Sequence, residues 1–172
     1  VDATVTGNNN VGGLTGDIYS ILESDINIEN VQTQIDINAN DYVGGLVGNI
    51  NTTSTGSISI ESAYSTGNIV ANNYVAGLVG NAKSENADVL NMNKVISSVN
   101  VEANDYAAGL IANSENVGIT NSYSVGNVKA NNYVGSFVGN AIKSNFENTY
   151  AVGTITATGT TVGGYAGYSS ES

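Results

Sequence analysis

The side chains that could do chemistry in this chain are almost all carboxylates and amides. The 172 residues include no His and no Cys, so a Ser-His triad, a cysteine nucleophile and the usual zinc sites have no residues to build them. Paired carboxylates remain, as in glycoside-hydrolysing proteins, but Asp36 and Glu61 occupy ordinary outward positions in predicted strands. Arg is absent and the four Lys are scattered, so no base accompanies the acids. The sequence therefore predicts a protein that is not an enzyme.

Calcium is the other chemistry that the carboxylates could support. The Asn40-Asp41 and Asn104-Asp105 pairs supply hard oxygen ligands, which makes Asp41 and Asp105 weak candidates for a metal site. Neither a calcium-binding nonapeptide nor an EF-hand loop occurs, and the two aspartates alternate with asparagines in successive copies of a repeat. We expect no cofactor and no obligatory metal, and calcium at these turns is the one exception left open.

These residues belong to a pattern that returns six times along the chain. Val43-Gly44-Gly45-Leu46-Val47-Gly48 is a clear copy, and the copies begin near residues 11, 43, 75, 107, 134 and 162. A fixed period in this range indicates one structural unit stacked on copies of itself. We therefore expect residues 1–172 to form a single repeat domain. Because the chain opens within a repeat, we also expect it to be a piece of a longer protein.

Within each copy, apolar and polar residues alternate as they do in half-buried strands. Ile35-Asp36-Ile37-Asn38 and Val99-Asn100-Val101-Glu102 are examples, and Asn-Asp or Asn-Asn pairs follow them as turns. The recurring columns are Leu14, Leu46, Leu78 and Leu110; Tyr42, Tyr74, Tyr106 and Tyr133; and Asn49, Asn81, Asn113 and Asn140. Stacked copies would place the asparagines in a hydrogen-bonded ladder and the tyrosines in an aromatic one.

Three short strands in a coil of 27–32 residues predict an all-β fold, a right-handed parallel β-solenoid of about six coils. Propeller blades need about 40 residues and four strands, which disfavours that alternative. The apolar pairs Leu46-Val47 and Leu78-Val79 leave one question open. In a regular strand they would face opposite sides, so either a bulge turns both inward or one row lies outside.

The Gly-Leu-x-Gly core, in units of about 30 residues paired with Tyr-Ser-x-Gly-Asn, resembles the GLUG motif family. Tyr64-Ser65-Thr66-Gly67-Asn68 shows the second element. The resemblance covers essentially the whole chain and weakens at Ala112, at Ser136-Phe137 and at Tyr165. GLUG repeats occur in large secreted bacterial surface proteins, including filamentous-haemagglutinin-like adhesins and immunoglobulin A1 proteases. The resemblance implies an extracellular or cell-surface location in bacteria and an adhesive or stalk role, and it carries over no catalytic residue.

Charge and composition restrict the partners. The net charge of −11 repels phosphate backbones and anionic lipid headgroups, so we expect no nucleic-acid partner and no membrane insertion. Ice binding would need Thr pairs in successive coils, but the outward pairs are Thr only at Thr4 and Thr6 and at Thr154 and Thr156. The leading hypothesis is a structural or adhesive rod that self-associates through its coil ends or its Gly-Leu face, or that contacts a host protein or glycan. An ice-binding or polysaccharide-processing β-helix is the alternative.

Overall fold

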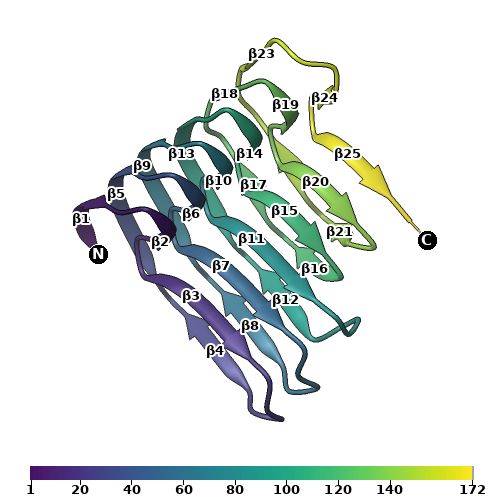
Figure 1. Cartoon of the computed structure of the whole chain (residues 1–172). Helices are drawn as coiled ribbons and strands as arrows, with labels where there is room; N and C mark the ends of the chain where they lie inside the picture. The colour runs from purple at the N-terminus through teal and green to yellow at the C-terminus, as the bar shows by residue number, and fades with distance from the viewer. Residues whose placement is uncertain (172) are drawn as a thin grey trace.

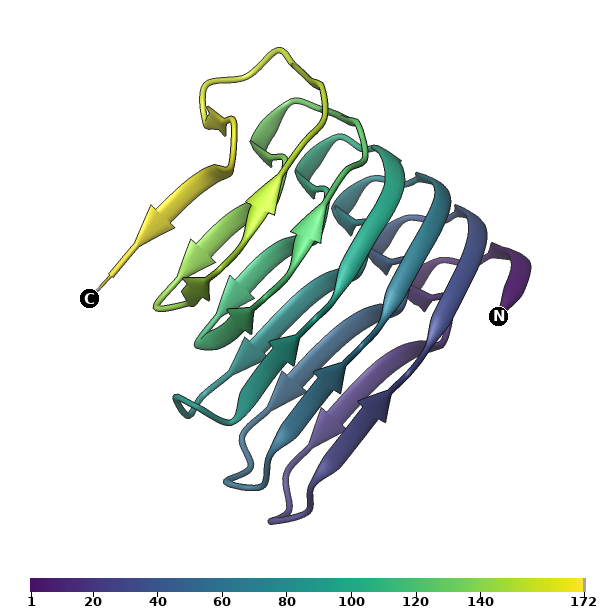
Figure 2. The ribbon, with the colours of Figure 1, turned by 180° about the vertical axis from the view of Figure 1, so that it is seen from behind.

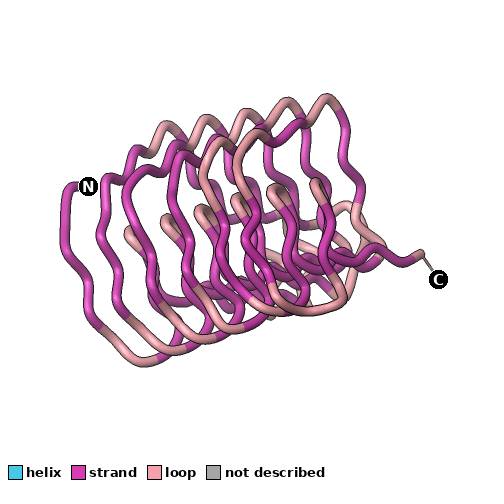
Figure 3. The backbone as a smooth tube through the Cα atoms, turned by 90° about the horizontal axis from the view of Figure 1, so that it is seen from above, coloured by secondary structure: helices cyan, strands magenta, loops and turns pink. Residues whose placement is uncertain are grey.

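The computed structural model describes residues 1–171 and shows an all-β parallel β-solenoid. In this part of the chain every strand pairing is parallel, the strands form four sheets, and no helix occurs (Figure 1). Seen from above, successive coils stack as rungs along one axis, with the two termini at opposite ends (Figure 3). Two of the sheets have six rungs and one has five, which is close to the expected number of coils. The predicted fold class is confirmed.

Each coil visits the four sheets in a fixed order. Sheet A contains β1 (Asp2–Thr6), β5 (Gln32–Asn38), β9 (Tyr64–Val70), β13 (Ile96–Glu102), β17 (Tyr123–Ser124), β18 (Val128–Ala130), β22 (Tyr150–Ala151) and β23 (Ile155–Ala157). Sheet B contains β2 (Asn9–Gly12), β6 (Asp41–Gly44), β10 (Asn73–Ala76), β14 (Asp105–Ala108), β19 (Asn132–Gly135) and β24 (Val162–Gly163). Sheet C contains β3 (Thr15–Ser20), β7 (Val47–Thr52), β11 (Val79–Ser84), β15 (Ile111–Glu115), β20 (Val138–Ile142) and β25 (Ala166–Ser170). Sheet D contains β4 (Ile26–Glu29), β8 (Ile58–Glu61), β12 (Leu90–Asn93), β16 (Val117–Thr120) and β21 (Asn145–Glu147).

The coil winds in the right-handed sense. In Figure 1 the strands of sheet C descend in front and the chain returns upward behind them as it advances from the N-terminal to the C-terminal end. Figure 2 shows the same sense from the other side, where the returning strands are in front. This is the handedness that the twist of parallel strands favours in crossover connections.

The coils have four strands where the sequence predicted three. The Gly-Leu segment is not one strand: in the second coil it divides into β6 and β7, which are separated by a bend at residues 45 and 46. The small residues Gly44 and Gly45 allow the backbone to turn there at close range to the next coil. The period-two pattern could not show this corner because the apolar run continues through it.

The shortening of the repeat from 32 to 27 residues falls at a single turn. In the second coil β7 and β8 are joined by residues 53–57, whereas in the fourth coil Asn116 alone joins β15 to β16 and has a φ of +53°. Val79 accordingly pairs with Ile111, 32 residues later, while Leu90 pairs with Val117, 27 residues later. The longer turns project beyond the sheets as a stack of loops at the lower edge of Figure 1. The rest of the coil therefore keeps its register.

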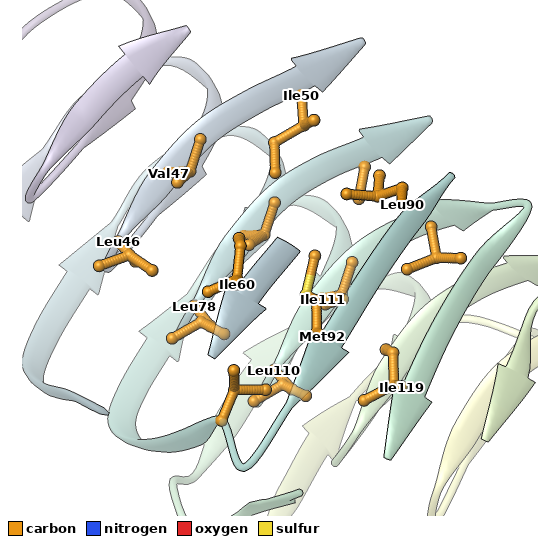
Figure 4. Close-up of a cluster of buried hydrophobic side chains, with 14 of the residues drawn as sticks. Leu46, Val47, Ile50, Ile60, Leu78, Leu90, Met92, Leu110, Ile111 and Ile119 are labelled. Atoms are coloured by element: carbon orange, nitrogen blue, oxygen red, sulfur yellow. The ribbon is translucent and has the colours of Figure 1, made fainter. Parts of the chain in front are cut away.

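The bend between sheets B and C resolves the adjacent apolar pairs. Leu46 and Val47 are both fully buried, as are Leu78 and Val79 in the next coil. Leu46 belongs to the bend and Val47 begins the new strand, so both side chains point into the rod (Figure 4). Leu110 is also fully buried, whereas Leu14 is 41% exposed in the first coil. In the central coils the Gly-Leu face, formed by segments such as Gly45-Leu46-Val47, therefore has no exposed row of apolar side chains. Association through this face would bury no such row.

Candidate functional site

The asparagine ladder predicted from the sequence is confirmed. Asn49 Nδ2 donates a hydrogen bond to Asp17 Oδ1 at 2.8 Å, and Asn81 donates in the same way to Asn49 at 2.8 Å. Asn113 and Asn140 continue the ladder with bonds of 2.7 and 2.6 Å. Because each coil repeats the last in register, one side chain per coil is enough to form a continuous chain of amide hydrogen bonds.

Three more ladders, which were not predicted from the sequence, run along the rod. One continues from Asn8 through Asn40, Asn72 and Asn104, a second from Asp36 through Asn68, Asn100 and Asn127, and a third from Glu61 through Asn93, Asn121 and Asn148. The sequence contains the pattern from which these ladders could have been predicted, because their asparagines recur at the period of the coil. Together the four ladders tie the outer sides of neighbouring coils to one another.

All four ladders have the same polarity, since each amide donates toward the N-terminal coil. A carboxylate can accept but cannot donate when ionised, and acids open three of the ladders, at Asp17, Asp36 and Glu61. The position of an acid in a ladder therefore follows from the direction of its hydrogen bonds. An acid is compatible with the first rung and not with a middle one.

This polarity predicts opposite outcomes for two charge changes. Asn81→Asp should lower the free energy of unfolding by about 1–3 kcal/mol, because the new carboxylate faces Asn49 Oδ1 with no proton to donate. Asp17→Asn keeps an acceptor at the first rung and should change stability by less than about 0.5 kcal/mol. Urea unfolding of both variants measures the difference. The Asn81→Asp loss should shrink below about pH 4, where the acid becomes protonated. Equal losses in the two variants would contradict the ladder polarity.

The tyrosine column forms a stack at the start of sheet B. The ring centroids of Tyr42, Tyr74, Tyr106 and Tyr133 are separated by 4.9, 4.5 and 4.4 Å in succession, with interplanar angles of at most 18°. All four tyrosines have left-handed backbone, with φ between +53° and +57°. The turn was predicted at the preceding Asn-Asp and Asn-Asn pairs, whose side chains tolerate a left-handed backbone, but in the central coils the left-handed residue is the tyrosine that follows them. Only in the first coil does an asparagine, Asn10, occupy the column with a φ of +53°.

The stack shifts the acidity of its inner rings. Burial, followed by the neighbouring Tyr42 phenol, raises the pKa of Tyr74, and burial together with the phenols of Tyr74 and Tyr133 raises the pKa of Tyr106. Since the folded state holds these protons more tightly than the unfolded state, their contribution to stability is complete below about pH 10. That contribution is lost as the pH rises through the folded-state pKa values.

Alkaline titration tests this effect. Above about pH 10 the rod should lose stability more steeply than a Tyr74→Phe, Tyr106→Phe variant, in which the rings still stack but cannot ionise. Denaturant unfolding at a series of pH values, with phenolate absorbance followed in parallel, gives both quantities. If the free energy of unfolding depended on pH in the same way in the two proteins, ionisation of the stacked tyrosines would not be linked to folding.

Asp41 and Asp105 lie in a polar column beside the tyrosines. Asp41 Oδ1 accepts hydrogen bonds from Asn73 N at 3.1 Å and from Asn73 Nδ2 at 2.9 Å. Asp105 Oδ1 accepts the equivalent pair from Asn132 at 2.8 and 3.1 Å. The two carboxylates are two coils apart, roughly 10 Å at the spacing of neighbouring strands, which is too far for one ion to bridge. Within residues 1–171 no three acidic side chains are grouped as a metal site.

Removing calcium should therefore leave the melting temperature unchanged. In each of Asp41 and Asp105 the Oδ1 atom already accepts two hydrogen bonds from the following coil, so one carboxylate offers calcium few of the six or more oxygen ligands that it needs. Thermal unfolding with and without a calcium chelator measures the effect. A marked drop in melting temperature on chelation would assign a cation to these turns.

The outer face of sheet A is hollowed along the rod. Two hollows of about 460 and 420 Å³ adjoin at Asn68, which lines both. The second ladder, through Asp36, Asn68 and Asn100, forms part of their lining. We call this surface the sheet A groove; it extends along the rod from Asp2 to Thr156. The polar side chains that line it, such as Asn68 and Asn100, lie at the outward positions that strand alternation predicted, but alternation does not indicate that the face is hollow.

The groove does not present the regular threonine array that ice binding needs. Of its outward columns, one reads Thr4, Asp36, Asn68, Asn100, Asn127 and Thr154 from coil to coil. The neighbouring column contains Glu102 and Lys129, whose charged groups lie 2.6 Å apart. Charges and amides therefore interrupt the threonines in the middle of the face.

Fold and surface together define the class of this protein as a parallel β-solenoid with polar side-chain ladders and one grooved face. No family model, curated protein or solved structure matches the chain. In the described residues no helix is both long and apolar enough to cross a bilayer.

Proposed function

We propose that the chain is a structural and adhesive rod, used as a stalk or filament segment of a secreted or cell-surface bacterial protein. The observation that carries this proposal is the continuous register of the coils. Four asparagine ladders and a tyrosine stack join successive coils along the rod. Such coupling suits a protein that must hold its length and direction, and nearest-neighbour contacts of this kind set the stability of repeat rods.

The proposed location rests on the sequence. The Gly-Leu-x-Gly and Tyr-Ser-x-Gly-Asn elements resemble GLUG repeats, which implies a bacterial surface protein. The acidic surface is compatible with the same role, because a net charge of −11 opposes side-by-side bundling of rods and contact with anionic membranes, and it leaves end-to-end stacking open. No catalytic role is proposed, since Asp36 and Glu61 serve as ladder acceptors and lie in different sheets.

Self-association is proposed to use the coil ends. Leu14 is 41% exposed in the first coil, whereas Leu46 and Leu78 in the same column are fully buried. The difference arises because Leu14 is covered by a coil on one side only. Wherever a rod ends in such a coil, a second copy stacked on it would bury this apolar surface and pair the strand edges. The Gly-Leu face between the ends offers no comparable surface.

Two measurements test the proposal. Antibodies against the chain should label intact cells of the source organism without permeabilisation, and labelling only after permeabilisation would overturn the surface assignment. Sedimentation at low and high ionic strength should show association that strengthens as salt screens the negative charge. If the chain is a strict monomer at high concentration under both conditions, self-association is wrong and only the stalk role remains proposed.

A further inference from the structure

We propose that the sheet A groove binds a neutral polysaccharide chain that lies parallel to the rod axis. This inference rests on the proposed adhesive role and names the ligand class for it. The groove runs along the rod across successive coils, and amides, hydroxyls and a few charged groups line it together with aliphatic side chains such as Val70. An elongated ligand with repeated polar groups fits such a surface better than a compact one does.

The asparagine ladder gives the groove a regular set of free donors. Asn68 donates one N–H to Asp36 at 3.0 Å, Asn100 donates one to Asn68 at 3.2 Å, and Asn127 donates one to Asn100 at 3.3 Å. A side-chain amide has two N–H donors, so each of these residues keeps a second one for a ligand. The ladder fixes the orientation of every amide. A ligand therefore meets donors that are already ordered and repeat once per coil, which reduces the entropic cost of binding.

The direction of the groove favours a polysaccharide over a peptide. Extended peptides bind sheets by adding a strand at an edge, where backbone groups are free. The groove instead lies on the face of sheet A, where backbone groups already pair between coils. The donors repeat at the spacing of the coils, about 4.8 Å, whereas an extended peptide advances about 3.3 Å per residue. A sugar chain presents hydroxyl groups, each both donor and acceptor, once per monomer along its length.

The charges of the groove favour a neutral sugar chain. Lys129 is the one cation among the residues that line it, and Lys129 Nζ lies 2.6 Å from Glu102 Oε1. Asp2 and Asp36 add negative charge at the other end. Uronic acids and sulfated sugars would meet repulsion both here and from the net charge of −11. A neutral chain meets no such penalty.

The test is an NMR titration of the folded chain with cellohexaose, maltohexaose and mannohexaose, with hexagalacturonate as the acidic comparison. At least one neutral hexasaccharide should shift the side-chain amide signals of Asn68, Asn100 and Asn127, and hexagalacturonate should not. Asn100→Ala should weaken that binding about tenfold, the equivalent of one hydrogen bond to the ligand. Asn72→Ala is the matched control, because it removes a middle rung from a ladder outside the groove and should leave affinity unchanged.

A second variant tests the charge argument. Glu102→Gln leaves Lys129 without its partner and should bring measurable binding of hexagalacturonate at low ionic strength. If no neutral hexasaccharide shifts the groove amides while the chain remains folded, the proposal is wrong, although the structural rod is unaffected. Amide shifts that depend on protein concentration alone would assign the groove to a second copy, and equal losses in Asn100→Ala and Asn72→Ala would place the sugar elsewhere. Each of these last two results would overturn the proposal that the groove binds a polysaccharide.

Discussion

Leu78→Ala is expected to lower the free energy of unfolding by about 2–5 kcal/mol. Leu78 is fully buried and belongs to the main apolar cluster, with coils stacked on both sides of it. Leu46 lies in the same column one coil earlier and Leu110 one coil later, so removing Leu78 leaves a cavity between two rigid layers (Figure 4). Backbone pairing on both sides prevents the coils from collapsing into that space. Denaturant unfolding provides the measurement.

Lys83→Ala is the control for this prediction. Lys83 lies on β11 in the same coil, and its charged group pairs with Glu115 at 2.9 Å on the surface. Exposed ion pairs of this kind contribute about 0–1 kcal/mol, so the loss should be small and should fade in high salt. If the two variants unfolded at the same denaturant concentration, the leucine column would not be the source of stability.

Gly67→Ala is expected to cost about 2–4 kcal/mol, because the backbone and the neighbouring coil both disfavour a side chain there. Gly67 has a φ of +124°, a conformation that residues with a Cβ rarely adopt. A Cβ at this position would also collide with the carbonyl oxygen of Ile35 in the preceding coil. That oxygen belongs to the backbone of β5, which cannot move without breaking the pairing of sheet A.

Gly164→Ala is the matched control, because a Cβ at Gly164 would have no atom within 4 Å and its φ lies outside the left-handed range. Its stability should change by less than about 0.5 kcal/mol. Thermal unfolding of the two variants compares the stability lost when a methyl group is added at each glycine. A Gly67→Ala protein as stable as the parent would show that sheet A can shift to accept a side chain.

Local patterns in the sequence were sufficient for much of the fold. The recurrence of one motif at 27–32 residues predicted stacked coils, because identical units can bury their apolar faces only against one another. Alternation in Ile35-Asp36-Ile37-Asn38 predicted correctly that Ile35 and Ile37 point inward and that Asp36 and Asn38 are exposed. The asparagine ladder followed from the same period, since a polar residue repeated in register must meet its own copy.

The tertiary structure decided the features that depend on where the chain turns. Leu46 and Val47 are adjacent yet both buried, because a corner lies between them, and alternation holds only within a strand. Tyr74 adopts a left-handed backbone that propensity assigns to asparagine, because its ring stacks on the tyrosines of both neighbouring coils. The sheet A groove likewise appeared only in three dimensions. Sequence period determines which residues meet from coil to coil, whereas the direction in which each sheet bends depends on the packing of the whole coil.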